Sequence, residues 1–171
     1  RALTRHLRTR GSMKGIISTL DRDPVSLARK AASAPGLGEQ DLVARVTCER
    51  SYRWDRQRDE RWSPTIIERG TDERRLHCVA FDFGIKENIL RLLDECAFRV
   101  TVVPARFSAT ETLELGPDAV FLSNGPGDPA VATYATDTVR TLIGRVPIFG
   151  ICLGHQIAAR ALGARTYKLK C

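Results

Sequence analysis

The sequence of 171 residues contains no apolar run that approaches the length of about 20 residues needed to cross a bilayer. It also opens with charged residues instead of the apolar segment of a secretion signal. We therefore expect a soluble, cytoplasmic protein that makes no membrane contact. Because the first residue is Arg1 and not methionine, we expect the sequence to be a piece whose true amino terminus is missing.

Paired cysteines and a nucleotide-binding loop are absent as well. The sequence has no C-x-x-C pair, and its odd number of widely spaced cysteines suits reduced thiols better than a disulfide framework or a zinc site. The five cysteines are Cys48, Cys78, Cys96, Cys152 and Cys171. The cysteine pattern leads us to expect no metal in this chain. No G-x-x-x-x-G-K-[ST] motif occurs, so we expect no ATP bound through that loop.

The net charge of +7 is concentrated in the first part of the chain. Residues 1–75 hold 17 Lys and Arg against 11 Asp and Glu, whereas residues 76–171 hold 10 against 9. A nucleic-acid-binding arm is one explanation of such a bias. The arginines of residues 45–75 alternate with acidic residues, and aromatic residues make up only 6% of the chain. We therefore expect a solvated or partner-facing surface and no nucleic acid.

The amino-terminal 75 residues are organised in two segments. Within residues 1–40, Leu3 and Leu7 mark one face of a first helix, and Asp23-Pro24 begins a second helix that runs to about residue 34. Residues 41–75 are charged and irregular, which is typical of a connection between domains.

Two features of that connection carry further expectations. A short ribbon is predicted around residues 63–68, and Trp54 and Trp62 are expected to pack against a domain rather than bind a ligand.

From residue 76 onward apolar strands alternate with helical patterns. Continuously apolar strands of this kind predict a mostly parallel sheet with helices on both faces, an α/β fold that places ligands at the carboxyl ends of its strands. The predicted strands are residues 77–83, 99–104, 119–123 and 146–151. The predicted helices are residues 85–97, 108–115 and 130–143, the second opening with a capping box of Ser108 and Glu111.

The junction after the fourth strand has the pattern of a nucleophile elbow. Gly150 and Gly154 flank Cys152 at the two positions where side chains would collide in a sharp strand-to-helix turn. The thiol is then expected to stand exposed at the first turn of a helix, whose free N–H groups favour a thiolate. The alternative is a buried structural cysteine, which the paired glycines argue against.

A second loop is expected at the same sheet edge. The third strand ends in residues 124–129, with the sequence N-G-P-G-D-P, and Gly125 there leaves a backbone N–H free to approach a ligand closely. A simple tight turn before a helix is the alternative for this loop taken alone.

These motifs resemble a known family. The sequences G-I-C-L-G-H-Q at 150–156 and L-S-N-G-P-G-D-P at 122–129 are similar to the triad-type, class I glutamine amidotransferases. The stretch D-F-G-I-K-E-N-I-L-R at 82–91 resembles in particular the small subunits of carbamoyl phosphate synthetases. The resemblance implies a flavodoxin-like glutaminase domain whose first half is residues 76–171, preceded in residues 1–40 by the end of a separate amino-terminal domain.

The resemblance also implies a function. Cys152 would attack glutamine to form a cysteinyl thioester, and the N–H groups of Gly125 and Leu153 would hold the oxyanion. Gly127 and Gln156, together with these two residues, would line the glutamine pocket. The ammonia would pass to a large partner subunit that uses ATP to make carbamoyl phosphate for arginine and pyrimidine synthesis, so no cofactor is expected in this chain itself.

None of the histidines in the sequence qualifies as the general base for glutamine hydrolysis. The family uses a His-x-Glu pair far downstream of the cysteine, and this chain has only three histidines. His155 lies three residues after Cys152, at a position that is not the base in the family. His77 begins the first strand, whose length separates it from the sheet edge that carries the sulfur, and His6 belongs to the other domain. We therefore expect the 171 residues alone not to turn glutamine over.

Three alternatives remain open at this stage. The chain could belong to the glutaminase component of anthranilate or GMP synthesis, which shares the elbow and the glycine loop. It could instead be a non-catalytic docking module. An FMN-binding flavodoxin-like protein is more distant, because an exposed thiol has no role in holding that cofactor.

Overall fold

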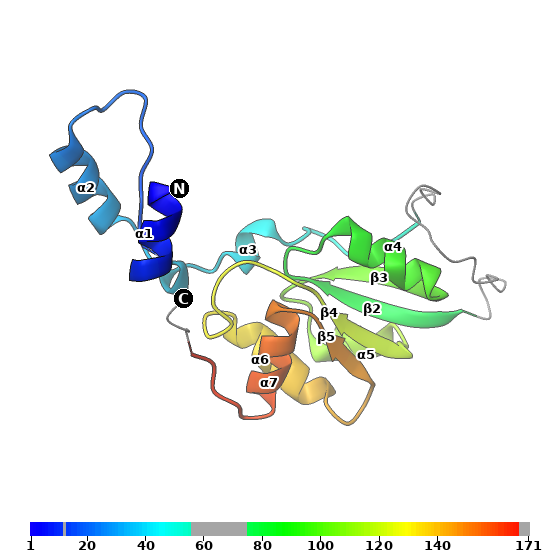
Figure 1. Ribbon diagram of the computed structural model, residues 1–171. Helices are drawn as coiled ribbons and strands as arrows, with labels where there is room; N and C mark the ends of the chain where they lie inside the picture. The colour runs from blue at the N-terminus through cyan, green and yellow to red at the C-terminus, as the bar shows by residue number, and fades with distance from the viewer. Residues whose placement is uncertain (12, 56–74, 168–171) are drawn as a thin grey trace. The chain divides into compact units, whose positions relative to one another are not determined.

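The computed structural model describes residues 1–11, 13–55 and 75–167 (Figure 1). Asp41–Thr166 forms one compact unit, and the described residues outside this range belong to a second. The predicted ribbon at 63–68 and Trp62 lie outside the described residues. Among the described residues, no helix combines the length and apolar character needed to span a membrane.

The amino-terminal unit contains α1 (Ala2–Arg10), α2 (Pro24–Ser33) and a short 3-10 turn (Leu37–Glu39). The Asp23 carboxylate caps α2 by accepting hydrogen bonds from the N–H groups of Val25, at 3.0 Å, and Ser26, at 3.2 Å. Both predicted helices are confirmed, yet neither buries a residue. Leu3 remains 70% exposed, so the apolar face of α1 is not covered within the described chain.

The larger unit is built on a five-stranded sheet in the order β1-β3-β2-β4-β5. The strands are β1 (Tyr52–Arg53), β2 (Leu76–Asp82), β3 (Phe98–Pro104), β4 (Ala119–Leu122) and β5 (Ile148–Gly150). All neighbouring strands are parallel except β1, which is antiparallel to β3. The predicted mostly parallel α/β sheet is thereby confirmed, with β1 as an addition that the sequence did not reveal.

Helices cover both faces of this sheet (Figure 1). Val79 and Phe81 of β2 face a core formed with α5 (Ala109–Glu114), α6 (Thr133–Leu142) and α7 (Leu153–Ala161). The alternate residues Cys78 and Ala80 face a smaller core that includes α4 (Glu87–Glu95). Burying each large apolar side chain contributes about 1.5–3 kcal/mol, so the two cores fix the sheet from both sides.

The residues expected to connect two domains contribute to the larger unit. Val43, in the short helix α3 (Val43–Val46), is 3% exposed and belongs to the first core, while Trp54 is 8% exposed and belongs to the second. The expectation that Trp54 packs against a domain is therefore confirmed.

Local hydrogen bonds set where two predicted helices begin. Because the Asp82 carboxylate accepts the N–H groups of Gly84 and Ile85, α4 starts at Glu87 and not at the predicted residue 85. The Asp128 carboxylate similarly accepts the Ala130 N–H at 2.9 Å, and α6 starts later than predicted.

The capping box of α5 is confirmed in both directions. The Ser108 hydroxyl accepts the Glu111 N–H at 3.2 Å, and the Glu111 carboxylate accepts the Ser108 N–H at 2.9 Å. The sequence pattern alone was sufficient here, because both partners are local.

Candidate active site

The turn between β5 and α7 holds Cys152 in an unusual backbone conformation. Its φ of 54° and ψ of −112° lie in a region that side chains rarely adopt and that costs about 1–3 kcal/mol. Two hydrogen bonds hold the turn: the Ile151 N–H donates to the Leu122 carbonyl at 3.0 Å, and the Gly154 N–H donates to the Ile151 carbonyl at 3.0 Å. Neighbouring structure thus forces the cysteine into the strained conformation of an elbow.

Two glycines make this turn possible. A Cβ on residue 150 would lie 2.6 Å from the carbonyl carbon of Gly154, and a Cβ on residue 154 would lie 2.2 Å from the Leu122 carbonyl oxygen. Both distances are far inside van der Waals contact. The predicted collision of side chains at residues 150 and 154 is confirmed.

The Cys152 side chain is exposed, although the helix that follows it is anchored in the core. Leu153 is 1% exposed and Ile157 is fully buried, whereas His155 and Gln156 are exposed. The sulfur therefore stands on a rigid support and is accessible to a substrate.

The glycine loop after β4 lies directly against the elbow. A Cβ on residue 125 would lie 2.1 Å from the Phe83 carbonyl oxygen and 2.8 Å from Cδ2 of Leu153. Gly127, with a φ of 92°, faces Leu42, whose Cβ would lie 3.6 Å from a Cβ on residue 127. The structure thus brings Gly125 and Leu153 together, while Gly127 lies against the α3 segment.

The backbone N–H groups of Gly125 and Leu153 are available to a ligand. Within the described residues, neither N–H donates a hydrogen bond to the protein. Since buried or half-buried N–H groups normally find partners, two such donors on neighbouring residues beside an exposed thiol are suited to binding a carbonyl oxygen that gains negative charge.

Hydrogen bonds to the turn after β2 brace the glycine loop. The Asn124 amide nitrogen donates to the Gly84 carbonyl at 3.0 Å, and its amide oxygen accepts the Lys86 N–H at 3.2 Å. The turn that presents Gly84 is itself held by Asp82, which is 7% exposed and accepts the N–H of Gly84 at 2.9 Å. In the sequence this stretch is informative only through its resemblance, and the bracing role was not predicted.

Ser123 was not predicted to be a site residue either. Ser123 is fully buried directly after β4, and its hydroxyl is hydrogen-bonded to the Phe83 N–H and the Asn124 carbonyl. The available signal was a hydroxyl that closes an otherwise apolar strand immediately before the glycine loop.

In this unit neither histidine lies in an arrangement that identifies a base. His77 is 4% exposed, and its Nε2 lies 2.8 Å from the Thr101 hydroxyl. Burial, followed by the charge of Arg99, lowers the pKa of His77 below its usual value. His155 is exposed on α7. His77 is thus a buried structural histidine at the start of a central strand, with Nε2 hydrogen-bonded and Nδ1 without a hydrogen-bond partner among the described residues.

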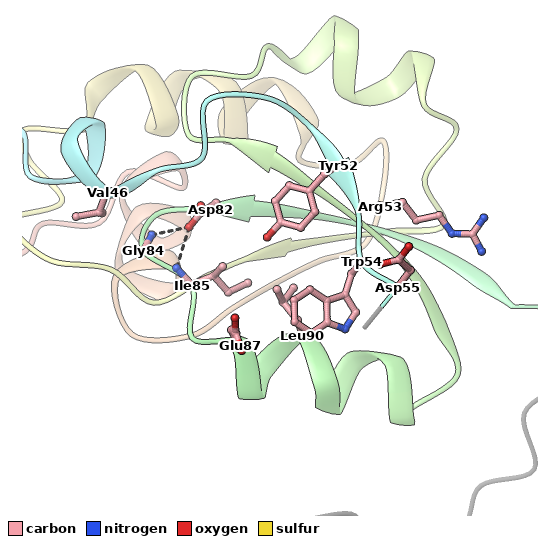
Figure 2. Close-up of a pocket in the computed structure, with 10 residues that line it drawn as sticks. All are labelled: Val46, Tyr52, Arg53, Trp54, Asp55, Asp82, Gly84, Ile85, Glu87 and Leu90. Atoms are coloured by element: carbon pink, nitrogen blue, oxygen red, sulfur yellow. Dashed lines mark hydrogen bonds between the residues drawn. The ribbon is translucent and has the colours of Figure 1, made fainter. Parts of the chain in front are cut away.

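A cavity of about 400 Å³ lies beside β1 and the start of α4 (Figure 2). It is lined by Val46, Tyr52, Arg53, Trp54, Asp55, Asp82, Gly84, Ile85, Glu87 and Leu90. Figure 2 shows the Asp82 carboxylate hydrogen-bonded to the N–H groups of Gly84 and Ile85. None of the predicted site residues lines the cavity, so the volume does not mark the thiol site.

Comparison with known proteins matches the part of the chain that contains the elbow and the glycine loop. The family model described as glutamine amidotransferase class-I matches residues 79–171. Among curated proteins, the carbamoyl phosphate synthase small chain of Syntrophotalea carbinolica is 51% identical over 99% of this chain and 45% of its own length. The chloroplastic small chains of Oryza sativa subsp. japonica and Arabidopsis thaliana are 47% and 40% identical, each over 99% of this chain, and 37% and 39% of their own lengths are covered.

The chain therefore spans less than half the length of these curated relatives. The family model, by contrast, covers more than half of the chain and includes the elbow, the glycine loop and the strands β3, β4 and β5. This chain belongs to the class-I glutamine amidotransferase family.

Proposed function

We propose that the chain is part of a glutamine-hydrolysing subunit of carbamoyl phosphate synthase. The observation that carries the proposal is the strained, exposed Cys152 beside the free N–H groups of Gly125 and Leu153. The names of the relatives supply the choice of synthase. A large partner subunit would consume the ammonia together with ATP, and this chain would need no cofactor of its own.

The chemistry would proceed in two steps. The Cys152 thiolate attacks the side-chain amide carbon of glutamine, and the carbonyl oxygen becomes an oxyanion that accepts the N–H groups of Gly125 and Leu153. The tetrahedral intermediate collapses as the amide nitrogen takes a proton and leaves as ammonia. Water then attacks the thioester, and glutamate leaves as the thiol is restored. One oxyanion donor is worth about 10²–10³ in rate.

Substrate binding would use the same edge of the sheet. Gly127 and Gln156 would line the glutamine pocket along with the two oxyanion donors, and the exposed position of Gln156 on α7 supports this role. A His-x-Glu pair would manage the protons, as the family resemblance implies. Assay of ammonia release by the purified 171-residue chain tests the associated proposal that these residues alone do not turn over.

The thiol chemistry is tested with a glutamine-like chloroketone and mass spectrometry on the complete protein encoded by the gene. We expect the label on Cys152 and protection by glutamine. Cys96, which is also exposed, is the internal control for labelling because it does not lie in an elbow beside the glycine loop. A label that divides equally between Cys152 and Cys96, or that glutamine does not reduce, contradicts the proposal and favours a non-catalytic docking module.

The partner is tested separately. Purification of the complete protein from its own cells should recover a large ATP-dependent subunit that makes carbamoyl phosphate. Recovery of an anthranilate or GMP synthase component would assign the glutaminase to that pathway instead. A cytoplasmic location is part of the proposal, and fractionation tests it, since the two plant relatives are named chloroplastic.

A further inference from the structure

Ser123 connects three parts of the candidate site through its backbone and side chain. Its N–H donates to the Phe81 carbonyl at 3.3 Å, and its carbonyl accepts the Gly154 N–H at 3.0 Å. Its hydroxyl accepts the Phe83 N–H at 2.9 Å and donates to the Asn124 carbonyl at 2.7 Å. The residue is 0% exposed, so no water competes for these bonds.

The last of these bonds controls the orientation of one peptide unit. The Asn124 carbonyl and the Gly125 N–H belong to the same planar peptide group, and the described chain contains no cis peptide bond. In a trans peptide the C=O and N–H groups point in opposite directions. A hydroxyl that holds the Asn124 oxygen therefore also fixes the direction of the Gly125 N–H.

Among the described residues, the two polar groups of this peptide make no other hydrogen bond. Gly125 has no side chain and tolerates a wide range of backbone conformations, and the next residue, Pro126, has no N–H to donate. Rotation of the Asn124–Gly125 peptide would turn the N–H away and place a carbonyl oxygen where a donor is needed. The Ser123 hydroxyl opposes that rotation, because the rotated carbonyl loses its hydrogen bond.

We propose that Ser123 is a positioning residue that keeps the Gly125 N–H directed toward the oxyanion. The inference rests on the proposed function, in which Gly125 is an oxyanion donor. Ser123 does not touch the substrate. It acts through the peptide that follows it, and its loss should lower the rate of the chemical step more than the binding of glutamine.

The test is steady-state glutamine hydrolysis by the complete protein with its partner subunit. Ser123→Ala removes both the donor to Asn124 and the acceptor for Phe83. We expect kcat to fall by about 10- to 10³-fold, up to the value of one oxyanion donor, with KM changed by less than about threefold. Ser123→Cys keeps a similar volume and a weaker donor, and its kcat should lie between those of the two other forms.

A matched control comes from Thr112 on α5. Thr112 is also 0% exposed, and its hydroxyl donates to the Ser108 carbonyl at 2.7 Å. Thr112→Val removes a buried hydroxyl of the same kind away from the glycine loop, and we expect its kcat to match that of the unsubstituted protein.

A second readout separates positioning from damage to the fold. Alkylation of Cys152 by iodoacetamide displaces iodide from a saturated carbon and forms no oxyanion. Its rate in Ser123→Ala should stay within about twofold of the original. Loss of alkylation in parallel with kcat, or a fall in kcat equally large in Thr112→Val, would overturn the inference.

The two proposals fail in different ways. If the unsubstituted protein does not hydrolyse glutamine, the proposed function is overturned and the inference falls with it. If it does hydrolyse glutamine and Ser123→Ala retains full kcat, only the positioning role of Ser123 is overturned.

Discussion

Gly154 packs so tightly against Leu122 that a Cβ on residue 154 would lie 2.2 Å from the Leu122 carbonyl oxygen. That oxygen already accepts the N–H of Ile151 at 3.0 Å, so it cannot move without breaking the turn that presents Cys152. The helix α7 and the strand β4 are thus held in direct backbone contact beside the thiol.

Gly154→Ala should therefore destabilise the fold strongly. We expect a loss of about 3 kcal/mol in the free energy of unfolding, at the upper end of the range for an overfilled core. Urea denaturation of the complete protein measures it. Gly15→Ala is the control, because a Cβ there meets no atom within 4 Å, and its effect should stay within about 0.5 kcal/mol. Equal denaturation midpoints for the two variants would contradict the tight contact.

Replacing Cys152 itself should reveal the strain of the elbow. Cys152→Gly and Cys152→Ala both remove the sulfur, but only glycine adopts a φ of 54° and a ψ of −112° without steric cost. We expect the glycine variant to be more stable than the alanine variant by about 1 kcal/mol, once glycine's greater chain entropy is subtracted. Thermal unfolding of the pair measures the difference. An alanine variant at least as stable as the glycine variant would show that the conformation is not strained.

Stability should fall at alkaline pH because of Cys78. Burial raises the pKa of this thiol from 9.0 to about 12. The folded protein holds the proton more tightly than the unfolded chain, so the contribution is complete below about pH 9 and is lost as the pH rises toward 12. The free energy of unfolding should decline by up to about 1.4 kcal/mol per pH unit in this window.

Urea midpoints between pH 8 and about pH 11 measure this decline. Burial and then the Asp82 charge raise the pKa of Cys48 to about 11, which adds to the effect in the same direction. Cys78→Ala should make the decline shallower, whereas Cys96→Ala, which changes an exposed thiol, should leave it as it was. An unchanged slope in Cys78→Ala would refute the assignment.

Ala97→Gly should stabilise the end of α4. Ala97 has a φ of 63°, the left-handed conformation that glycine favours after a helix. Because a side chain there costs about 1–2 kcal/mol and glycine costs part of this in entropy, we expect a net gain of about 0.5–1 kcal/mol. Chemical denaturation checks it. Ala159→Gly inside α7 should lose about as much, and a loss in both variants would argue against the left-handed conformation at residue 97.

The sequence predicted the parts of the fold whose signals are local or periodic. Continuous apolar runs identified β2, β3, β4 and β5, and the glycines at 150 and 154 identified the elbow. These features were predictable because each is determined by residues close together in the chain.

Features that depend on contacts between distant residues were not predictable in the same way. The two residues of β1 carry no alternation of their own, and they become a strand only because β3 offers a partner at Val102 and Thr101. The hydroxyl of Ser123 has a role only once Phe83, 40 positions earlier in the chain, lies beside it. Neither pairing can be recognised from the residues that are local in the sequence.

The residues from Val43 to Cys48 determine where the larger unit can be separated from the rest of the chain. The Cys48 N–H donates to the Asp82 carboxylate at 2.8 Å, the Thr47 hydroxyl accepts the Ala105 N–H at 2.9 Å, and Val43 lies in the core. A recombinant domain cut at the first long strand would lose all three contacts, leaving a buried carboxylate short of a donor. An autonomous version must therefore keep these residues, and the compact unit that contains them begins at Asp41.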